Sequence, residues 1–295
     1  MFTLKVENER GDVLTLTQDQ TRYQIIDIDG LNPPNAIINS SEIVGMDGSK
    51  FQSSKLGERN IVLTVRINGN VEANRINLYR YFKSKRRHKI YYKNRNRDVY
   101  IEGYVEAIEN NLFTLGQTMQ ISIVCNDPYF KSVEEIYSDI STILASFTFP
   151  FAFGGAGVLA STQTDDAIPF SILQKDRIVN IVNDGESDTG LEISITATGT
   201  VLNPKIYNNV TGEFFGLTMT MIKGDLLTVN TNRGQKSVTL TRDGVNTNVI
   251  ANVSRESTWL TLDMGDNQFS YTTDTEGGEE LLQIVFKHRT IYEGV

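Results

Sequence analysis

The second half of the chain is built from short runs in which apolar and polar residues alternate, and this period of two limits what it can fold into. Every second residue from Leu191 to Ala197 is apolar, and Leu217 to Met221 repeats the pattern. Alternation places the two sets of side chains on opposite faces of a strand. Turn signals recur roughly every ten residues, which is typical of a β-sandwich. They fall at 211–212, 223–225, 232–234, 243–244 and 265–267, and a late strand is expected at 281–286.

The first half combines strands with one helix. Ile61–Ile67 alternates and ends at the turn Asn68–Asn70, after which the apolar period becomes helical. We expect an amphipathic helix over residues 71–84. Its stripe comprises Val71, Arg75, Ile76, Leu78, Tyr79 and Phe82. Further strands are expected at 89–93, 99–108 and 119–125. Together these elements predict an α+β domain, with one helix packed on a mostly antiparallel sheet.

Residues 131–168 form the boundary between the halves. Residues 131–144 are acidic with a weakly helical pattern, 147–153 are aromatic, and the glycine-rich stretch 154–157 breaks regular structure. A phosphate-binding loop at 153–157 is disfavoured, because no Gly-Lys-Ser/Thr follows and no parallel βαβ unit surrounds it. We therefore expect a flexible connection there.

The formal charges differ between the halves. Residues 1–132 carry 18 Lys and Arg against 15 Asp and Glu, a net charge of +3, whereas residues 133–295 carry 10 against 21, a net of −11. Such asymmetry favours two domains that face different surroundings. The acidic half also argues against tight wrapping of nucleic acid, because Lys and Arg provide most of the affinity for phosphate.

The composition is that of a soluble globular protein, with 39% apolar and 22% charged residues. No run reaches the ~18–20 uncharged apolar residues that a membrane-spanning helix needs, so we expect no membrane insertion. The N-terminus lacks the charged head, apolar core and cleavage site of a secretory signal. We therefore expect synthesis and folding in a cytoplasm.

Cys125 is the only cysteine, which excludes an intrachain disulfide and a thiolate metal cluster. In the predicted strand it shares one face with Met119, Ile121 and Ile123. We expect a buried and chemically inert thiol, because a free cysteine packs like a small apolar residue.

A dense basic cluster lies between residues 83 and 97. It comprises Lys83, Lys85, Arg86, Arg87, Lys89, Lys93, Arg95 and Arg97, with His88, Tyr91 and Tyr92 interleaved. Phosphate contacts with aromatic stacking would make it a nucleic-acid site. However, Tyr91 and Tyr92 point to opposite faces of one strand and cannot form a single platform. A solvated helix end followed by an exposed hairpin is the favoured interpretation, and an inter-subunit surface is the next.

Residues with catalytic potential do not form a known pattern. His88 and His288 are the only histidines, and no metalloprotease, serine-hydrolase or zinc-ligand spacing contains them. The second half is rich in acids, namely Asp263, Asp266, Asp274, Glu276, Glu279 and Glu280. A pair of these acids could in principle hydrolyse a glycoside. Several lie in turn compositions, where Asp and Asn are expected for backbone reasons. We expect an exposed acidic rim, and no catalytic residue, metal or cofactor.

Trp259 is the only tryptophan and lies in the short pattern Ser257–Leu262. On a β-sandwich, a lone tryptophan either packs in the core or forms a platform on which a sugar stacks. Large residues on both faces of this pattern favour core packing.

Several strings, in one order along the chain, resemble the distal tail protein family of long-tailed bacteriophages. In the first half they are Ile28–Pro34, Gly45–Gly48, Glu58–Ile61, Leu78–Phe82, Ile101–Glu106 and Asn126–Phe130. In the second half they are Phe149–Phe151, Asn203–Ile206, Asn209–Glu213, Gly224–Asp225, Ser257–Trp259 and Gly265–Asn267.

The resemblance implies a mainly β protein with an N-terminal ring-forming (belt) domain and a C-terminal galectin-like β-sandwich. The belt domain would comprise residues 1–132 with 287–295, because the last residues tend to return to it in that family, and the sandwich would comprise 133–286. The implied function is a structural ring, usually a hexamer, at the virion tail tip, assembled in the host bacterial cytoplasm. Its expected partners are further copies of itself, the tail tube protein, tail-associated or tail-tip proteins, and receptor-binding or baseplate proteins, with DNA passing passively through the lumen. The alternative is a lectin-like module that binds host cell-wall glycan.

Overall fold

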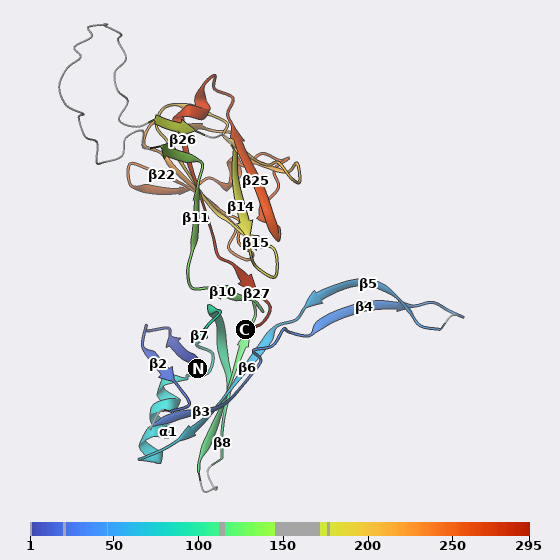
Figure 1. Cartoon of the computed structure of the whole chain (residues 1–295), viewed down its shortest axis with the longest axis vertical. Helices are drawn as coiled ribbons and strands as arrows, with labels where there is room; N and C mark the ends of the chain where they lie inside the picture. The colour runs from blue at the N-terminus through green and yellow to red at the C-terminus, as the bar shows by residue number, and fades with distance from the viewer. Residues whose placement is uncertain (1, 20–21, 46, 112–115, 145–171, 176–177) are drawn as a thin grey trace, which may run out of the picture. The chain divides into compact units, whose positions relative to one another are not determined.

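The computed structural model describes residues 2–19, 22–45, 47–111, 116–144, 172–175 and 178–295 (Figure 1). The contacts divide the chain into two compact units. Unit 1 consists of Met1–Glu135, Asp184–Asp188 and Arg289–Val295, and unit 2 of Ile136–Asn183 and Thr189–His288. The aromatic run 147–153 and the glycine-rich stretch 154–157 lie outside the described residues. The described part of the chain is mainly β, as predicted, with one α-helix.

Unit 1 is built on an antiparallel sheet that curls into a barrel. The strand order is β2-β1-β7-β8-β9-β6-β3. The strands are β1 (Thr3–Asn8), β2 (Val13–Leu16), β3 (Tyr23–Asp29), β6 (Arg59–Ile67), β7 (Arg87–Lys93), β8 (Asp98–Asn110) and β9 (Thr118–Cys125). A parallel bridge between Thr17 and Gln24 joins the two ends of this path. The strands expected from the alternating pattern at 61–67, 89–93, 99–108 and 119–125 are therefore confirmed.

The barrel encloses one apolar core, to which every strand and the helix contribute. Helix α1 (Val71–Tyr81) begins after Asn70, whose side-chain oxygen accepts a hydrogen bond from the Ala73 amide at 3.3 Å. Leu78 and the helix C-cap residue Phe82 are fully buried in this core. Two other members of the predicted stripe, Ile76 and Tyr79, are 41% and 39% exposed, so the buried face is narrower than the spacing predicted.

The C-terminal residues return to unit 1. β27 (Ile291–Tyr292) pairs with β10 (Phe130–Ser132), which in turn pairs with β8. This pairing agrees with the return of the last residues that the family resemblance implies.

The weak helix predicted over 131–144 is wrong. These residues form β10, β11 (Ile136–Asp139) and β12 (Ser141–Leu144). β11 pairs with β26 (Leu282–His288) in the register Ile136–His288, and β12 pairs with β13 (Ile172–Lys175). Pairing with strands far along the chain overrides a weak local preference for helix.

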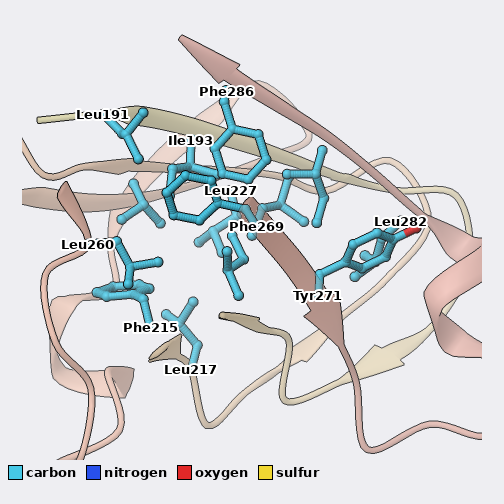
Figure 2. Packing of buried hydrophobic residues seen from close by; sticks show 14 of the residues in the cluster. Leu191, Ile193, Phe215, Leu217, Leu227, Leu260, Phe269, Tyr271, Leu282 and Phe286 are labelled. Atoms are coloured by element: carbon cyan, nitrogen blue, oxygen red, sulfur yellow. The ribbon is translucent and has the colours of Figure 1, made fainter. Parts of the chain in front are cut away.

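Unit 2 is a sandwich of two antiparallel sheets, ordered β11-β26-β16-β21-β22-β23 and β14-β25-β18-β19. The remaining strands of these sheets are β14 (Ile178–Asn183), β16 (Glu192–Ala197), β18 (Lys205–Asn208), β19 (Phe214–Gly216), β21 (Leu226–Asn230), β22 (Ser237–Arg242), β23 (Val245–Asn248) and β25 (Gly265–Thr272). Figure 2 shows side chains of both sheets meeting in the core, where the rings of Phe269 and Phe286 lie 5.2 Å apart. The predicted β-sandwich is confirmed.

Short elements complete unit 2. They are the strand pairs β15 (Thr189–Gly190) with β24 (Thr261–Leu262) and β17 (Val201–Leu202) with β20 (Thr220–Met221), and the 3₁₀ turns η1 (Ile250–Asn252) and η2 (Gly278–Leu281).

Two local predictions in unit 2 are wrong. The strand expected over 217–221 is reduced to Thr220–Met221, because the Leu217 amide bonds the Pro204 carbonyl and its backbone bridges Val253. The turn expected at 265–267 is the start of β25. There the buried Asn267 donates through Nδ2 to the carbonyls of Asp263 and Gly265, at 2.8 and 3.0 Å. Its side chain holds the bend just before the strand.

Candidate functional site

Unit 1 carries a two-stranded ribbon outside the barrel, which we call the arm. It consists of β4 (Ala36–Glu42) and β5 (Ser49–Leu56), which form a separate two-stranded sheet. The ribbon leaves the barrel where β3 ends and re-enters it where β6 begins (Figure 1). Every residue of β4 and β5 is exposed except Ser41 and Leu56, which are half-buried. The alternating pattern did not single out this hairpin.

The two faces of the arm differ in chemistry. Ile38 and Ser40 lie on the same face of β4, and Phe51 of β5 lies opposite Ser40. Ile38 and Phe51 therefore share one face of the arm, where they are 65% and 61% exposed. The other face carries Lys50 and Lys55, opposite Ser41 and Ile37. An isolated two-stranded ribbon is marginally stable in water, and an exposed apolar face adds to that cost. The arm thus has the character of a surface that another molecule covers.

The base of the arm is organised around Arg59, the first residue of β6, which is only 3% exposed. Its Nε donates to the Pro128 carbonyl at 2.8 Å, and Nη1 donates to the carbonyls of Gly30 and Asn32 at 2.6 and 2.7 Å. Its Nη2 donates to the Glu293 carbonyl. Burial lowers the pKa of Arg59, while Cys125 and Glu293 act in the opposite direction.

Three of the strings that carry the family resemblance meet at this guanidinium. Gly30 and Asn32 belong to the string Ile28–Pro34, Arg59 to Glu58–Ile61, and Pro128 to Asn126–Phe130. The centroid of the Phe130 ring lies 4.6 Å from the guanidinium carbon. These strings therefore share a structural role at the base of the arm. Sequence spacing could not indicate this, because the acceptors are backbone carbonyls that no side-chain pattern identifies.

Residues Arg289–Val295, which we call the tail, are fixed to unit 1 along their length. Arg289 Nη1 donates to the carbonyls of Ser132 and Val133 at 2.8 and 2.5 Å, and its Nη2 pairs with Glu135 at 2.6 Å. At the other end, the Val295 amide donates to the Leu31 carbonyl at 3.2 Å. The C-terminus thus lies against the loop that leads into the arm (Figure 1).

Arg97 holds the tail between these points. Its Nη1 donates to the Gly294 carbonyl at 2.5 Å, its guanidinium lies 4.2 Å from the Tyr292 ring centroid, and it pairs with Glu186. The Glu186 carboxylate also accepts the Glu293 amide at 2.9 Å. The hydrogen bond from Arg97 lowers the pKa of Glu186. Arg97 was grouped with the basic cluster, but its role here is to anchor the tail.

Five of the eight cations in the basic cluster pair with carboxylates, Arg97 among them through Glu186. Arg86 pairs with Glu9, Lys93 with Asp98, and both Arg87 and Lys89 with Glu102. The Tyr91 ring lies 5.9 Å from that of Tyr100, whereas Tyr92 stacks on Phe2 at 5.8 Å. The prediction that the two tyrosines belong to different faces is confirmed, and no single stacking platform forms from them.

A cavity of about 390 Å³ lies beside the end of α1. Its lining includes Arg10, Arg80, Lys83 and Arg86 together with Glu9 and Asp12. Four cations and two carboxylates thus line the cavity, and one of these cations, Arg86, pairs with Glu9.

The two histidines belong to different units. His88 is buried in unit 1, with its ring nitrogens 3.1 and 3.2 Å from the carbonyls of Arg86 and Tyr81. His288 is buried in unit 2, and neither of its ring nitrogens has a hydrogen-bond partner among the residues that the structure describes. Burial lowers the pKa of His288.

The predicted acidic residues of unit 2 bind neighbouring polar groups. Asp274 accepts from Asn203 at 2.8 Å and from Lys205 at 3.2 Å, and these bonds lower its pKa. Asp266 accepts from Asn180 at 3.0 Å, and Glu279 accepts from Thr272 at 3.1 Å. Among the residues that the structure describes, no group of three or more His, Cys, Asp and Glu could hold a metal ion.

Cys125 is buried as predicted, whereas Trp259 is half-buried and packs against the sandwich core instead of inside it. The Trp259 ring packs 5.3 Å from that of Phe215 against the sandwich core, with Lys236 Nζ 5.3 Å from its centroid. Cys125 is fully buried, and burial raises the pKa of its thiol to about 12. In the described ranges, every helix is too short or too polar to cross a membrane.

Two known domain families match the chain. Residues 10–124 match the phage tail protein RIFT-related domain, and residues 184–289 match the C-terminal domain of the siphovirus-type tail component. Among curated proteins, no sequence matches this chain.

Solved structures share the fold over the whole chain. The crystal structure of the SPP1 Dit (gp 19.1) protein, described as a paradigm of hub adsorption apparatus in Gram-positive infecting phages, has a TM-score of 0.69 and 11% identity, with 99% of each chain covered. A chain of the phage P2 baseplate in its activated conformation with Ca has a TM-score of 0.54 and 11% identity, with 100% of each chain covered. At such low identities the likeness concerns the fold alone.

Proposed function

This chain belongs to the family of siphovirus distal tail proteins, and from that premise we propose that it joins the tail tube of a phage to the tail-tip apparatus that recognises the host. Six copies form a ring, and DNA passes through its opening. Further partners are the tail tube protein, a tail-associated protein and receptor-binding or baseplate proteins. The ring is assembled in the cytoplasm of the host bacterium and functions in the virion.

The observation that carries the ring proposal is the arm. A closed ring requires two different surfaces on every copy, because each subunit contacts its neighbours head to tail. The arm supplies one such surface, with Ile38 and Phe51 on its apolar face. Covering this face with a second copy removes the cost of leaving a two-stranded apolar ribbon in water.

The two domains have different roles in this proposal. Residues 1–132 with 287–295 act as the belt domain that forms the ring, and residues 133–286 act as the domain on which other tail-tip proteins dock. The contrast in net charge, +3 for residues 1–132 and −11 for 133–295, supports different surroundings for the two parts.

We propose no enzymatic activity, and no cofactor, for this chain. The family is structural, Asp274 and Asp266 bind neighbouring polar side chains, and His88 and His288 belong to different units. Function then rests on the geometry of the assembled ring.

Glycan binding by the sandwich remains the alternative function. The position of Trp259 does not favour it, because the ring packs against Phe215 and Lys236 covers it. Binding to host cell walls that disappears in Trp259→Ala, with the fold retained, would support the alternative.

Light scattering and negative-stain imaging of the purified protein test the ring. We expect about six copies per particle and a central opening, since closed homo-oligomers follow from head-to-tail contacts. A strict monomer at every concentration would contradict the proposal.

Glutamate substitutions on one face of the arm or the other test whether the apolar face forms the contact between copies. Ile38→Glu with Phe51→Glu should abolish the ring, because burying two unpaired carboxylates costs several kcal/mol. Asn39→Glu with Ser53→Glu adds the same charge to the opposite face and should retain the ring. Equal behaviour of the two variants would exclude the apolar face from the contact.

A further inference from the structure

The loop Gly30–Pro34 connects β3 to the arm, and it lies directly on the backbone of β6. Gly30 has a φ of +86°, and a Cβ placed there would lie 2.1 Å from the Asn60 carbonyl oxygen. Only glycine allows this approach. The direction in which the arm leaves the barrel is therefore set by how this loop is held.

Arg59 and the tail hold the loop from its other side. Arg59 Nη1 bonds the carbonyls of Gly30 and Asn32, while its Nη2 bonds the carbonyl of Glu293 in the tail. A Cβ on Gly294 would lie 2.9 Å from Pro33 Cδ, which shows how closely tail and loop pack. One buried guanidinium thus links three layers: β6, the loop and the tail.

Loss of the tail would disturb this link for electrostatic reasons. In these contacts Arg59 is bound by backbone carbonyls, which carry partial charges. If the Glu293 carbonyl leaves, a buried charged group loses an acceptor, and Arg59 must reach water or find another partner. Either change moves the donors that hold Gly30 and Asn32, and with them the base of the arm.

We propose that the docked tail sets the direction of the arm, so that an arm ready to contact a second copy exists only while the tail lies on Arg59. Arg59 and Arg97 are positioning residues in this device. The link to assembly rests on the ring proposal, whereas the effect on the arm itself does not. Any partner that captures the tail would therefore release the arm and oppose assembly.

Spin labels measure the direction of the arm in solution. Cys125 is buried, so cysteines introduced by Ser49→Cys in the arm and Gln120→Cys on the barrel surface can be labelled selectively. Labelled chains are diluted into unlabelled protein, and the distance distribution between labels is recorded by pulsed electron resonance. We expect one narrow distribution with the tail present, and a broad one in a chain that ends at Tyr292.

Arg97→Gln provides a second variant that keeps the full chain, with Arg95→Gln as the matched surface control. Arg97→Gln removes an anchor of Gly294 and should broaden the distribution, whereas Arg95→Gln should not.

Light scattering measures the assembly of the ring in a separate experiment. The protein concentration at half-assembly should rise about tenfold without the tail, the factor expected when one hydrogen bond to a charged group is lost. An unchanged distance distribution in the shortened chain overturns the proposal. The proposal also fails if removing the tail lowers the protection of amides from hydrogen exchange in β9 as much as in the arm. The tail would then stabilise the barrel as a whole. If the full chain is a monomer, the ring proposal fails, but the spin-label result still decides the role of the tail.

Discussion

The two buried histidines show how much the chemistry of one residue depends on its neighbours. The His88 ring lies between two carbonyl acceptors and stacks on Phe82 at 5.3 Å. In the described part of the chain, neither nitrogen of the His288 ring has a hydrogen-bond partner. A charge on such a buried ring is costly, so burial lowers the pKa of His288 in the folded protein.

A pH dependence of unit 2 follows from His288. The unfolded chain binds a proton near pH 6.5, and the folded chain binds it only at lower pH, so the stability due to the neutral ring is complete above pH 6.5 and is lost as the pH falls below it. We expect His288→Leu to flatten the fall in unfolding free energy between pH 7 and pH 5, by up to about 1.4 kcal/mol per pH unit. Urea unfolding at several pH values measures this, with pH 7.5 as the reference. Parallel pH profiles for the two proteins would refute the assignment.

Arg59 marks the limit of prediction at this scale. The strings around Gly30, Arg59 and Pro128 could be recognised in the sequence, but their meeting point could not. The Glu293 carbonyl that completes the site lies 234 residues along the chain from Arg59. Backbone acceptors leave no trace in residue type, so neither spacing nor composition predicts such a site.

Among the elements, those with a clear period were predicted and those defined by distant pairing were not. The strand Ile61–Ile67 and the helix start at Val71 follow from local alternation and spacing. β11 was mistaken for helix because its partner β26 is remote in sequence. The arm was missed because neither face of Ala36–Glu42 is buried in unit 1, so no alternation was needed there.

Helix α1 gives a prediction about which of its residues anchor it. Phe82 is fully buried in the barrel core, whereas Ile76 is 41% exposed although the spacing places it in the same stripe. We expect Phe82→Ala to lower the free energy of unfolding by about 3–5 kcal/mol, and Ile76→Ala to change it by less than about 0.5 kcal/mol. Denaturant unfolding of both variants checks this. Similar losses in the two would mean that the helix buries its wider predicted face.

At the scale of the whole molecule, the residues that the structure describes form two separate apolar cores. Ile121 is fully buried in the core of unit 1, and Leu227 in that of unit 2. Each core is built from strands of its own unit, so each unit can lose its packing by itself. Two domains could be expected from the sequence, but the excursion of Asp184–Asp188 into unit 1 had no signal there.

Trp259 lies in unit 2 and is the only tryptophan, so its fluorescence reports the unfolding of that unit. Leu227→Ala should lower the midpoint seen by fluorescence, at a cost of about 2–5 kcal/mol. Ile121→Ala should lower a midpoint seen by far-ultraviolet circular dichroism and leave the fluorescence transition in place. A shift of the fluorescence midpoint in both variants would mean that the two cores melt as one.

The arm also has a consequence for how the protein behaves before it meets its partners. Its strands expose backbone donors and acceptors along their outer edges, and the apolar face beside them carries Ile38 and Phe51. Such edges pair readily with other extended chains, including other arms in the wrong register. If the subunits form a ring as proposed, ring closure competes with fibrous aggregation of free subunits, and the outcome depends on how quickly neighbouring copies are supplied. Co-expression with a partner that covers the arm should raise the yield of soluble protein. A concentrated solution of the chain alone should become turbid with time as it aggregates.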